Sequence, residues 1–142
     1  MGFSEAIITL AAVWIAWAVF NISLVLMTER RAKLAGVGAY VVGIWRPRIV
    51  VMPEVRDALS ARENIAVWMH EYGHLHHRHI QKNLVIAILL PFYRSRARVT
   101  RQELEADGYV REAGLGPELA SALRKLSSHP FDLLRAQLLD RG

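Results

Sequence analysis

Hydrophobic positions divide the chain into an apolar N-terminal stretch and a mixed remainder. From Ala6 to Met27 no residue is charged, and the stretch is long enough for the roughly 20 residues that a membrane-crossing helix needs. It lacks the basic start and the small-residue cleavage site of a secretory signal peptide, which favours a retained anchor. A buried core helix is the alternative, because Asn21 and Ser23 interrupt the apolar run. We predict a membrane anchor over residues 1–33 and one domain over residues 34–142.

Charges on either side of this stretch indicate its orientation. Arg30, Arg31 and Lys33 follow it, whereas the N-terminal side holds Glu5 and no Lys or Arg. The positive-inside rule then places the C-terminal domain in the cytoplasm, at the cell membrane, with a single crossing. The absence of cysteine agrees with a reducing compartment.

Short β-branched runs come next along the chain. Residues 36–45 and 49–52 have the glycine-punctuated, β-branched character of strands, and Pro53 closes the second. A small sheet is therefore expected ahead of the helices. A free edge of that sheet would suit an extended peptide that adds as a further strand.

Helical spacing takes over after residue 59. Ser60 followed by Glu63 is the signature of a capping box, and apolar residues then recur on one helical face: Ile65, Trp68, Met69, Tyr72 and Leu75. Later helices are expected at 100–110, 116–126 and 131–139. The predicted fold class is α+β and mostly helical, with one modest core.

The pentapeptide His70-Glu71-Tyr72-Gly73-His74 carries a metal-binding pattern. Positions i and i+4 share one face of a helix, so both imidazoles can bind a single zinc ion. Glu71 points about 100° around the helix from His70, which places it as a base for a water on the metal. A histidine-rich surface helix is the alternative, because further histidines follow at positions 76, 77 and 79.

A third ligand is expected from the helix at 100–110. Glu103 and Asp107 lie four positions apart on one face of it, and we assign Glu103 to the metal and Asp107 to orienting one imidazole through its free N–H. Glu103 also has the spacing of a capping-box partner for Thr100, a structural role that would compete for the same oxygen. Glu105 is the rival ligand, but it points away from Asp107 and fits better as a solvated charge.

These residues resemble a known group of enzymes. His70-Glu71-Tyr72-Gly73-His74, followed by Glu103-Leu104-Glu105-Ala106-Asp107, is similar to the HExxH and ExxxD pattern of gluzincin metallopeptidases of the HtpX and CAAX-prenyl-protease type. Residues 48–53 agree, as do Ser128-His129-Pro130 and Arg135. The resemblance covers about residues 45–140.

The resemblance implies a small zincin-like domain, a minimal gluzincin. It implies that His70, His74 and Glu103 bind Zn²⁺, that Glu71 is the general base, and that His129 or Arg135 stabilises the oxyanion. A His-Pro pair also commonly starts a helix, and an arginine can serve only in a salt bridge. The chain also resembles BlaR-type sensor proteases, and it departs from the HtpX pattern in having one clear membrane segment instead of several.

A second apolar run, from Leu84 to Tyr93, lies between the two ligand-bearing helices, with basic residues on both sides. It is too short to span a bilayer, so it either packs in the core or enters the membrane interface. The net charge of +5 comes without a nucleic-acid reader motif, and a membrane surface explains it better than nucleic acid does.

The sequence thus predicts a membrane-anchored zinc endopeptidase that hydrolyses polypeptide substrates through a metal-activated water. A zinc-bound regulatory or sensor module with little constitutive proteolysis is the main alternative, and a metal-free structural protein is another. Repressor-cleaving proteases of the ImmA type fit less well, because of Asp107 and the N-terminal span. The sequence indicates neither the substrate nor the oligomeric state.

Overall fold

The structure, a computed structural model, describes residues 3–26, 38–43, 46–90 and 95–141. Its elements in chain order are α1 (Phe3–Leu26), β1 (Ala39–Val42), β2 (Arg48–Val51), α3 (Pro53–Ala58), α4 (Ala61–His76), α5 (His79–Leu89), α6 (Arg96–Glu112), α7 (Gly116–Leu126) and α8 (Pro130–Asp140). The predicted α+β, mostly helical fold class is confirmed.

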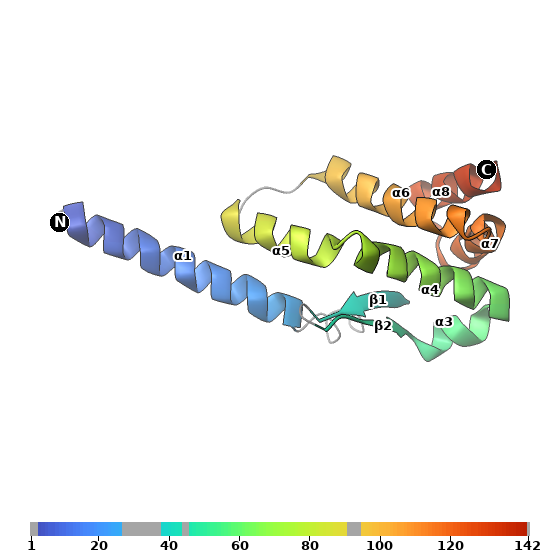
Figure 1. Cartoon of the computed structure of the whole chain (residues 1–142), viewed down its shortest axis with the longest axis horizontal. Helices are drawn as coiled ribbons and strands as arrows, with labels where there is room; N and C mark the ends of the chain where they lie inside the picture. Colours follow the sequence, from blue (N-terminus) through green and yellow to red (C-terminus); the bar gives the residue numbers. More distant parts are fainter. Residues whose placement is uncertain (1–2, 27–37, 44–45, 91–94, 142) are drawn as a thin grey trace.

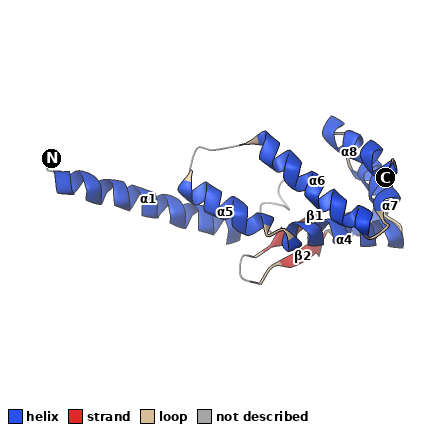
Figure 2. Ribbon diagram, turned by 45° about the horizontal axis from the view of Figure 1, so that its top comes forward, coloured by secondary structure: helices blue, strands red, loops and turns tan. Residues whose placement is uncertain are grey.

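The elements form an extended arm and a compact end (Figure 1). Helix α1 projects from the rest of the molecule, and α5 packs beside it. At the other end α4 packs against α6 and α7, and α7 packs against α8. The antiparallel pair β1–β2, in which Val41 pairs with Ile49, lies against α4 (Figure 2).

Small residues let the helices of the compact end approach closely. Six alanines or valines among the described core residues have no exposed surface: Ala66, Ala106, Val110, Ala120, Ala122 and Ala136. An alanine has no side chain beyond Cβ, so helix axes can come near one another without losing packing density. The result is a tight bundle that fixes α4 relative to α6, α7 and α8.

The capping box predicted at the start of α4 is confirmed. The Ser60 hydroxyl accepts a hydrogen bond from the Glu63 amide, and the Ser60 amide donates to Glu63 Oε2 at 2.7 Å. Glu63 also accepts hydrogen bonds from Ser121 (2.6 Å) and Lys125 (2.8 Å) of α7. The Glu63 carboxylate therefore caps the N-terminus of α4 and also attaches this helix to α7.

The helices at 116–126 and 131–139 are confirmed as α7 and α8, but the start predicted for the third-ligand helix is wrong. Helix α6 begins at Arg96 and is capped by Ser95, whose hydroxyl accepts from the Arg98 amide. Thr100 therefore lies inside the helix, and the capping box expected between Thr100 and Glu103 does not form. Ser95 is an equally good N-cap residue one turn earlier.

The predicted strands are confirmed in their central parts, while residues 36–37 and 44–45 lie outside the described residues. Pro53 does more than close β2, because it opens the short helix α3. Proline fits the first turn of a helix, where its missing N–H is not needed. The sequence analysis did not predict this helix.

Helix α1 does not behave as a core helix. Its apolar window Ser4–Ser23 has no buried share, and it is the helix in the described part of the chain long and apolar enough to cross a membrane. Asn21 donates to the Trp17 carbonyl and Ser23 to the Val19 carbonyl, each at 2.9 Å. Both polar groups are satisfied within the helix. Residues 30, 31 and 33, on which the predicted orientation depends, lie outside the described residues.

Candidate metal centre

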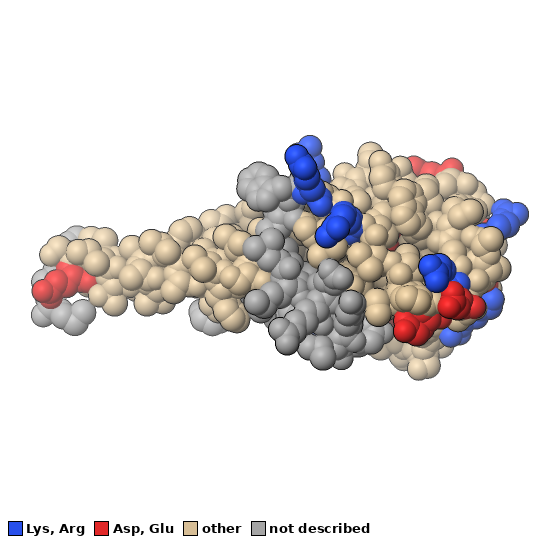
Figure 3. All heavy atoms as spheres, turned by 90° about the horizontal axis from the view of Figure 1, so that it is seen from below, with Lys and Arg blue, Asp and Glu red and all other residues tan. Residues whose placement is uncertain are grey.

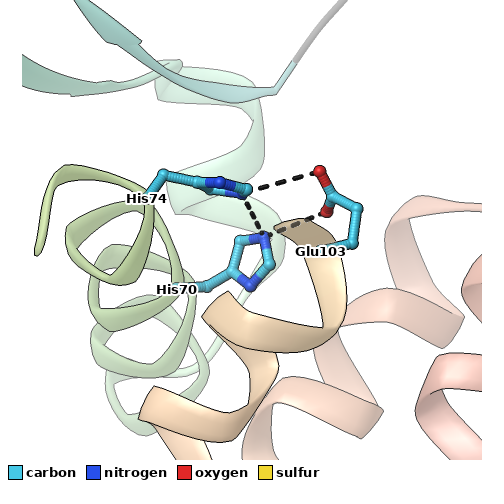
Figure 4. A group of neighbouring side chains, drawn as sticks. All are labelled: His70, His74 and Glu103. Carbon is cyan, nitrogen blue, oxygen red and sulfur yellow. Dashed lines mark hydrogen bonds and ion pairs between the residues drawn. The ribbon is translucent and has the colours of Figure 1, made fainter. Parts of the chain in front are cut away.

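Three donor side chains from α4 and α6 lie together, with one ligand atom from each within 4.8 Å of the others (Figure 4). His70 Nε2 lies 3.2 Å from His74 Nε2 and 3.3 Å from Glu103 Oε2. His74 Nε2 lies 3.6 Å from Glu103 Oε1. The two imidazoles come from successive turns of α4, and the carboxylate reaches them from the facing α6.

The spacing of these donors fits a zinc ion. Nitrogen and oxygen ligands about 2.0–2.2 Å from a tetrahedral ion are about 3.3–3.5 Å from each other. The three distances lie close to that separation, and two imidazoles with one carboxylate are a donor set that zinc takes in catalytic sites. The residues predicted as ligands are therefore placed where one ion can contact all three.

Gly73 explains why α6 can come so close to α4. A Cβ at this position would lie 3.0 Å from the Cα and 3.2 Å from the carbonyl oxygen of Ala106. Both atoms belong to backbone, which cannot move aside as a side chain can. The glycine within the pentapeptide thus sets the helix separation at which Glu103 reaches the two histidines.

Each imidazole is also held at its outer nitrogen. His70 Nδ1 lies 3.0 Å from Asp107 Oδ1, which is the arrangement expected for Asp107. His74 Nδ1 lies 2.8 Å from His79 Nδ1, and His79 Nε2 lies 2.9 Å from Glu105 Oε2. Such outer contacts fix the ring orientation and the tautomer of a metal-binding histidine.

Glu105 is partly solvated, with its side chain 36 % exposed, but it also has a partner that the sequence did not indicate. Its carboxylate binds the buried imidazole of His79, which is only 3 % exposed. In the sequence, His79 belongs to the group of histidines at positions 76, 77 and 79. In the structure it begins a separate helix, α5. Arg78, which stands between the two helices, has a φ of 54° and reverses the chain there. The residue spacing does not indicate this turn, which brings the His79 side chain into contact with His74.

Arg135 of α8 joins the cluster from the other side. Its Nε and Nη2 donate to the two oxygens of Asp107 at 2.8 and 2.7 Å, and its Nη1 lies 3.1 Å from both Glu103 Oε2 and Asp132 Oδ1. The residue is 5 % exposed. A buried guanidinium that faces three carboxylates neutralises charge that would otherwise be costly to hold together.

Protonation of the two histidines differs strongly. Burial alone would lower the pKa of His70, but its hydrogen bonds with Asp107 and Glu103 outweigh burial and raise the pKa to about 9. Burial, together with the positive charge on His70, lowers the pKa of His74 to about 4. The metal-free pair therefore holds one proton near neutral pH. A divalent cation that takes its place must displace that proton.

Glu71 lines the same cavity as His70, His74 and Glu103, a space of about 590 Å³ bordered by β1 and by apolar side chains of α7. Burial raises the pKa of the Glu71 carboxyl, while the neighbouring positive charge of His70 opposes that shift. The Glu71 carboxylate thus lies in the same cavity as the three donor side chains.

The structure does not bring His129 to this cluster. Its imidazole Nδ1 accepts a hydrogen bond from the Phe131 amide and caps α8, and the side chain lines a different cavity beside Arg96 and Arg98. The alternative role of a His-Pro pair, starting a helix, describes what His129 does. Arg135 alone of the two oxyanion candidates borders the cavity with Glu71.

A helix with the HExxH pentapeptide, facing a second helix that supplies a carboxylate, defines the class of gluzincin metallopeptidases. The sequence model of Peptidase family M48 matches residues 24–99, more than half of the chain. The chain therefore belongs to Peptidase family M48, a family of metal-dependent peptidases, and the predicted resemblance to the HtpX and CAAX-prenyl-protease type is confirmed.

The match includes α4 with both histidines and ends before Glu103, so the third donor is identified by its position in the structure. No curated protein and no solved structure matched the chain. The resemblance to BlaR-type sensor proteases stays a prediction.

Proposed function

We propose that the chain is a membrane-anchored zinc endopeptidase whose metal ligands are His70, His74 and Glu103. The observation that carries the proposal is a cluster of three donor side chains from two separate helices, in which one ligand atom from each lies within 4.8 Å of the others and the two Nε2 atoms are 3.2 Å apart. Three side chains that merely avoided one another would leave the buried carboxylate and imidazoles farther apart or differently paired.

A zinc ion held by His70, His74 and Glu103 would supply a Lewis acid that polarises the scissile carbonyl and makes a water molecule easier to deprotonate near neutral pH. Glu71 takes the proton of that water on its carboxylate and passes it to the nitrogen of the leaving amine. For the oxyanion we assign Arg135 and not His129, because Arg135 borders the same cavity as Glu71. Asp107 holds His70 in its orientation.

The polypeptide substrate lies in the cavity beside β1. Ala39, Tyr40 and Val41 of β1 line that cavity, and β2 occupies the other edge of the strand. An extended peptide can hydrogen-bond to the edge of β1 that no other described strand occupies, with little dependence on its sequence. Apolar side chains of α7, Leu119 and Leu123 among them, border the same space and favour an apolar substrate residue.

Helix α1 anchors the domain. The basic residues that follow it, Arg30, Arg31 and Lys33, indicate that the cavity lies on the cytoplasmic side. The helix is uncharged from Ala6 to its end at Leu26, and most of its large apolar side chains between Ile7 and Ile22 are exposed. With no protein to cover this surface, a bilayer is the environment that suits it.

The proposal is tested by metal content and by turnover of an unfolded substrate such as casein, on the detergent-solubilised chain. Glu71→Gln should retain zinc and lose about 10²–10⁴-fold in turnover, because the proton acceptor is gone while the ligands remain. Glu103→Ala should lose most of the zinc. Glu112→Gln, at an exposed position of α6, is the control and should change neither.

Other outcomes would point elsewhere. Full activity in Glu71→Gln would refute the assigned base. Zinc at one per chain without turnover in the wild type would favour a regulatory zinc module. No zinc, with thermal stability unaffected by His74→Ala, would leave only a structural protein.

A further inference from the structure

Helix α5 leaves the compact end of the molecule with an apolar surface that resembles that of α1. From Asn83 to Leu90 it has no charged residue. Three of its large apolar side chains are more than half exposed: Val85 (52 %), Leu89 (62 %) and Leu90 (53 %). The same holds for α1, for example at Val13 (64 %) and Ile15 (56 %). The two helices pack side by side (Figures 1 and 2), so these exposed side chains belong to neighbouring helices.

A hydrogen bond joins the two helices at the C-terminal end of α5. The Trp17 indole donates from Nε1 to the Ala87 carbonyl at 2.9 Å. Ala87 lies in the last turn of α5, where backbone carbonyls have no partner within the helix. A carbonyl left unpaired in hydrocarbon costs several kcal/mol, whereas in water it needs no protein donor. The indole thus supplies the partner that this end of α5 needs in the absence of water.

The position of Trp17 gives a depth. It lies six residues inside the end of the apolar window Ser4–Ser23, a distance of about 9 Å at the helical rise of 1.5 Å per residue. Since α1 crosses the bilayer in the proposed function, Ala87 must lie at about the same depth. A segment too short to span has then entered the hydrocarbon layer beside one that spans it.

We propose that α5 is a re-entrant membrane helix, whose face at Val85, Leu89 and Leu90 contacts lipid acyl chains. The bilayer is its partner, because α5 packs beside the lipid-facing helix α1 and because basic side chains lie at its domain end. Lys82 precedes the uncharged stretch, and Arg96 and Arg101 of α6 are exposed. Such residues are attracted to anionic headgroups. On the face shown in Figure 3, the Lys and Arg side chains of the described residues lie on the domain and not along the extended arm.

The other end of α5 is fastened to the metal centre. His79, its first residue, contacts His74 at 2.8 Å, and Asn83 and Gln102 exchange two amide hydrogen bonds of 3.0 Å between α5 and α6. Only about one helical turn separates His79 from the uncharged stretch that begins at Asn83. The cavity therefore opens at the membrane surface. Resting on the proposed function, this makes the substrate class the membrane-adjacent segments of polypeptides.

The absence of cysteine from the chain allows a direct test of depth. Single cysteines at Val85 or Leu89, labelled with a nitroxide, are compared in the Glu71→Gln background, reconstituted in phosphatidylcholine vesicles with anionic phosphatidylglycerol. Ile8→Cys on α1 (68 % exposed) is the lipid reference, and Leu134→Cys on α8 (50 % exposed) is the matched aqueous control. The measurement is the collision rate of each label with oxygen, which concentrates in lipid, relative to a water-soluble nickel chelate.

Labels at 85 and 89 should show an oxygen-to-nickel ratio far above that at 134 and approaching that at 8. A ratio at 85 and 89 equal to that at 134, with 8 in lipid, would overturn the proposal and leave the anchor intact. Protection from both reagents, with dipolar broadening between labels, would also overturn it, because a second copy would then cover α5. A label at 8 that is itself in water would refute the anchor of the proposed function, independently of any proteolysis.

Trp17→Phe provides a second readout, because it keeps an aromatic ring and removes only the donor. The label at 89 should move toward water, seen as a lower oxygen-to-nickel ratio. Trp14→Phe, the same change one turn earlier at a side chain 46 % exposed, should leave the ratio unchanged. An equal ratio in wild type and Trp17→Phe would refute the role of the indole as a partner for the carbonyl in lipid.

Discussion

In α1 the apolar side chains face outward, with Ile8 68 % and Leu10 71 % exposed, whereas α4 buries a histidine and a glutamate, His70 and Glu63. The two helices thus reverse the usual distribution of polar and apolar groups. In both, polar side chains in a medium of low dielectric constant lie beside other polar groups. Asn21 bonds to its own helix, and His70 has Asp107. What differs is the range of the pairing, which is local in the arm and long-range in the metal centre.

This difference predicts that a single substitution in the metal centre also disturbs residues of other helices, whereas a substitution in the arm affects only its own surroundings. Removing one member of a buried charge cluster leaves the others unpaired. Removing an apolar side chain that faces lipid leaves no charge uncompensated. The following predictions test that contrast, beginning with the largest effect.

Arg135→Ala should destabilise the chelator-treated protein by about 3–5 kcal/mol, because Asp107, Glu103 and Asp132 would lose their shared cation. The free energy of unfolding in detergent, followed by circular dichroism, measures the effect. Leu10→Ala in α1 is the comparison and should change it far less. Equal losses in the two variants would contradict the contrast between the two regions.

Gly73→Ala should cost about 1–3 kcal/mol, because its methyl group would press on the backbone of Ala106 in a site without free space. It should also weaken zinc binding by moving Glu103 away from the histidines. Gly108→Ala in α6 is the matched control, since a Cβ there meets nothing within 4 Å. That variant should gain about 0.5–1 kcal/mol, the usual helix preference of alanine over glycine. Thermal unfolding with and without zinc separates the two effects, and a stabilised Gly73→Ala would show that the helices can separate freely.

His79→Ala should lower zinc affinity by about tenfold, because His74 would lose the contact that fixes its ring. Glu105→Gln should have a smaller effect in the same direction. Competition with a chromophoric chelator measures the affinity, and His76→Ala, at an exposed histidine, serves as control. Unchanged affinity in His79→Ala would mean that the protein packing alone orients His74.

The smallest effect concerns pH. Hydrogen bonds from Lys125, Ser121 and Ser60 lower the pKa of Glu63 from 4.5 to about 2. A carboxyl whose pKa is lowered in the folded state stabilises the fold above pH 4.5, and this contribution is lost as pH falls toward 2. Glu63→Gln should therefore be less stable than wild type near pH 7, and the gap should narrow below pH 4.5. A gap independent of pH would exclude the ionised carboxylate as its cause.

Ser60→Ala isolates the other half of the capping box, because serine does not titrate. Its cost should be about 1 kcal/mol, the usual value for an N-cap. Thermal melts at pH 7 and pH 3 check both variants. A cost for Ser60→Ala far below 1 kcal/mol at pH 7 would show that the Ser60 hydroxyl is not needed to start α4.

Much of the fold was predictable because its signals are local. The capping box at Ser60, the prolines at the starts of α7 and α8, and the uncharged stretch of α1 each depend on a few neighbouring residues. The placing of His70 and His74 on one face follows from helix periodicity alone. The start of α6 was missed because Ser95 and Thr100 are both good caps, and local preference does not choose between them.

The sequence by itself determined which residues can bind a metal and which stretch suits a membrane, because residue chemistry and helical spacing suffice for both. Only the tertiary structure decided that His79 and Glu105 support His74, and that Trp17 meets the end of α5. Those contacts join residues 26 and 70 positions apart. They depend on the turn at Arg78 and on the packing of helices, which no local pattern along the chain specifies.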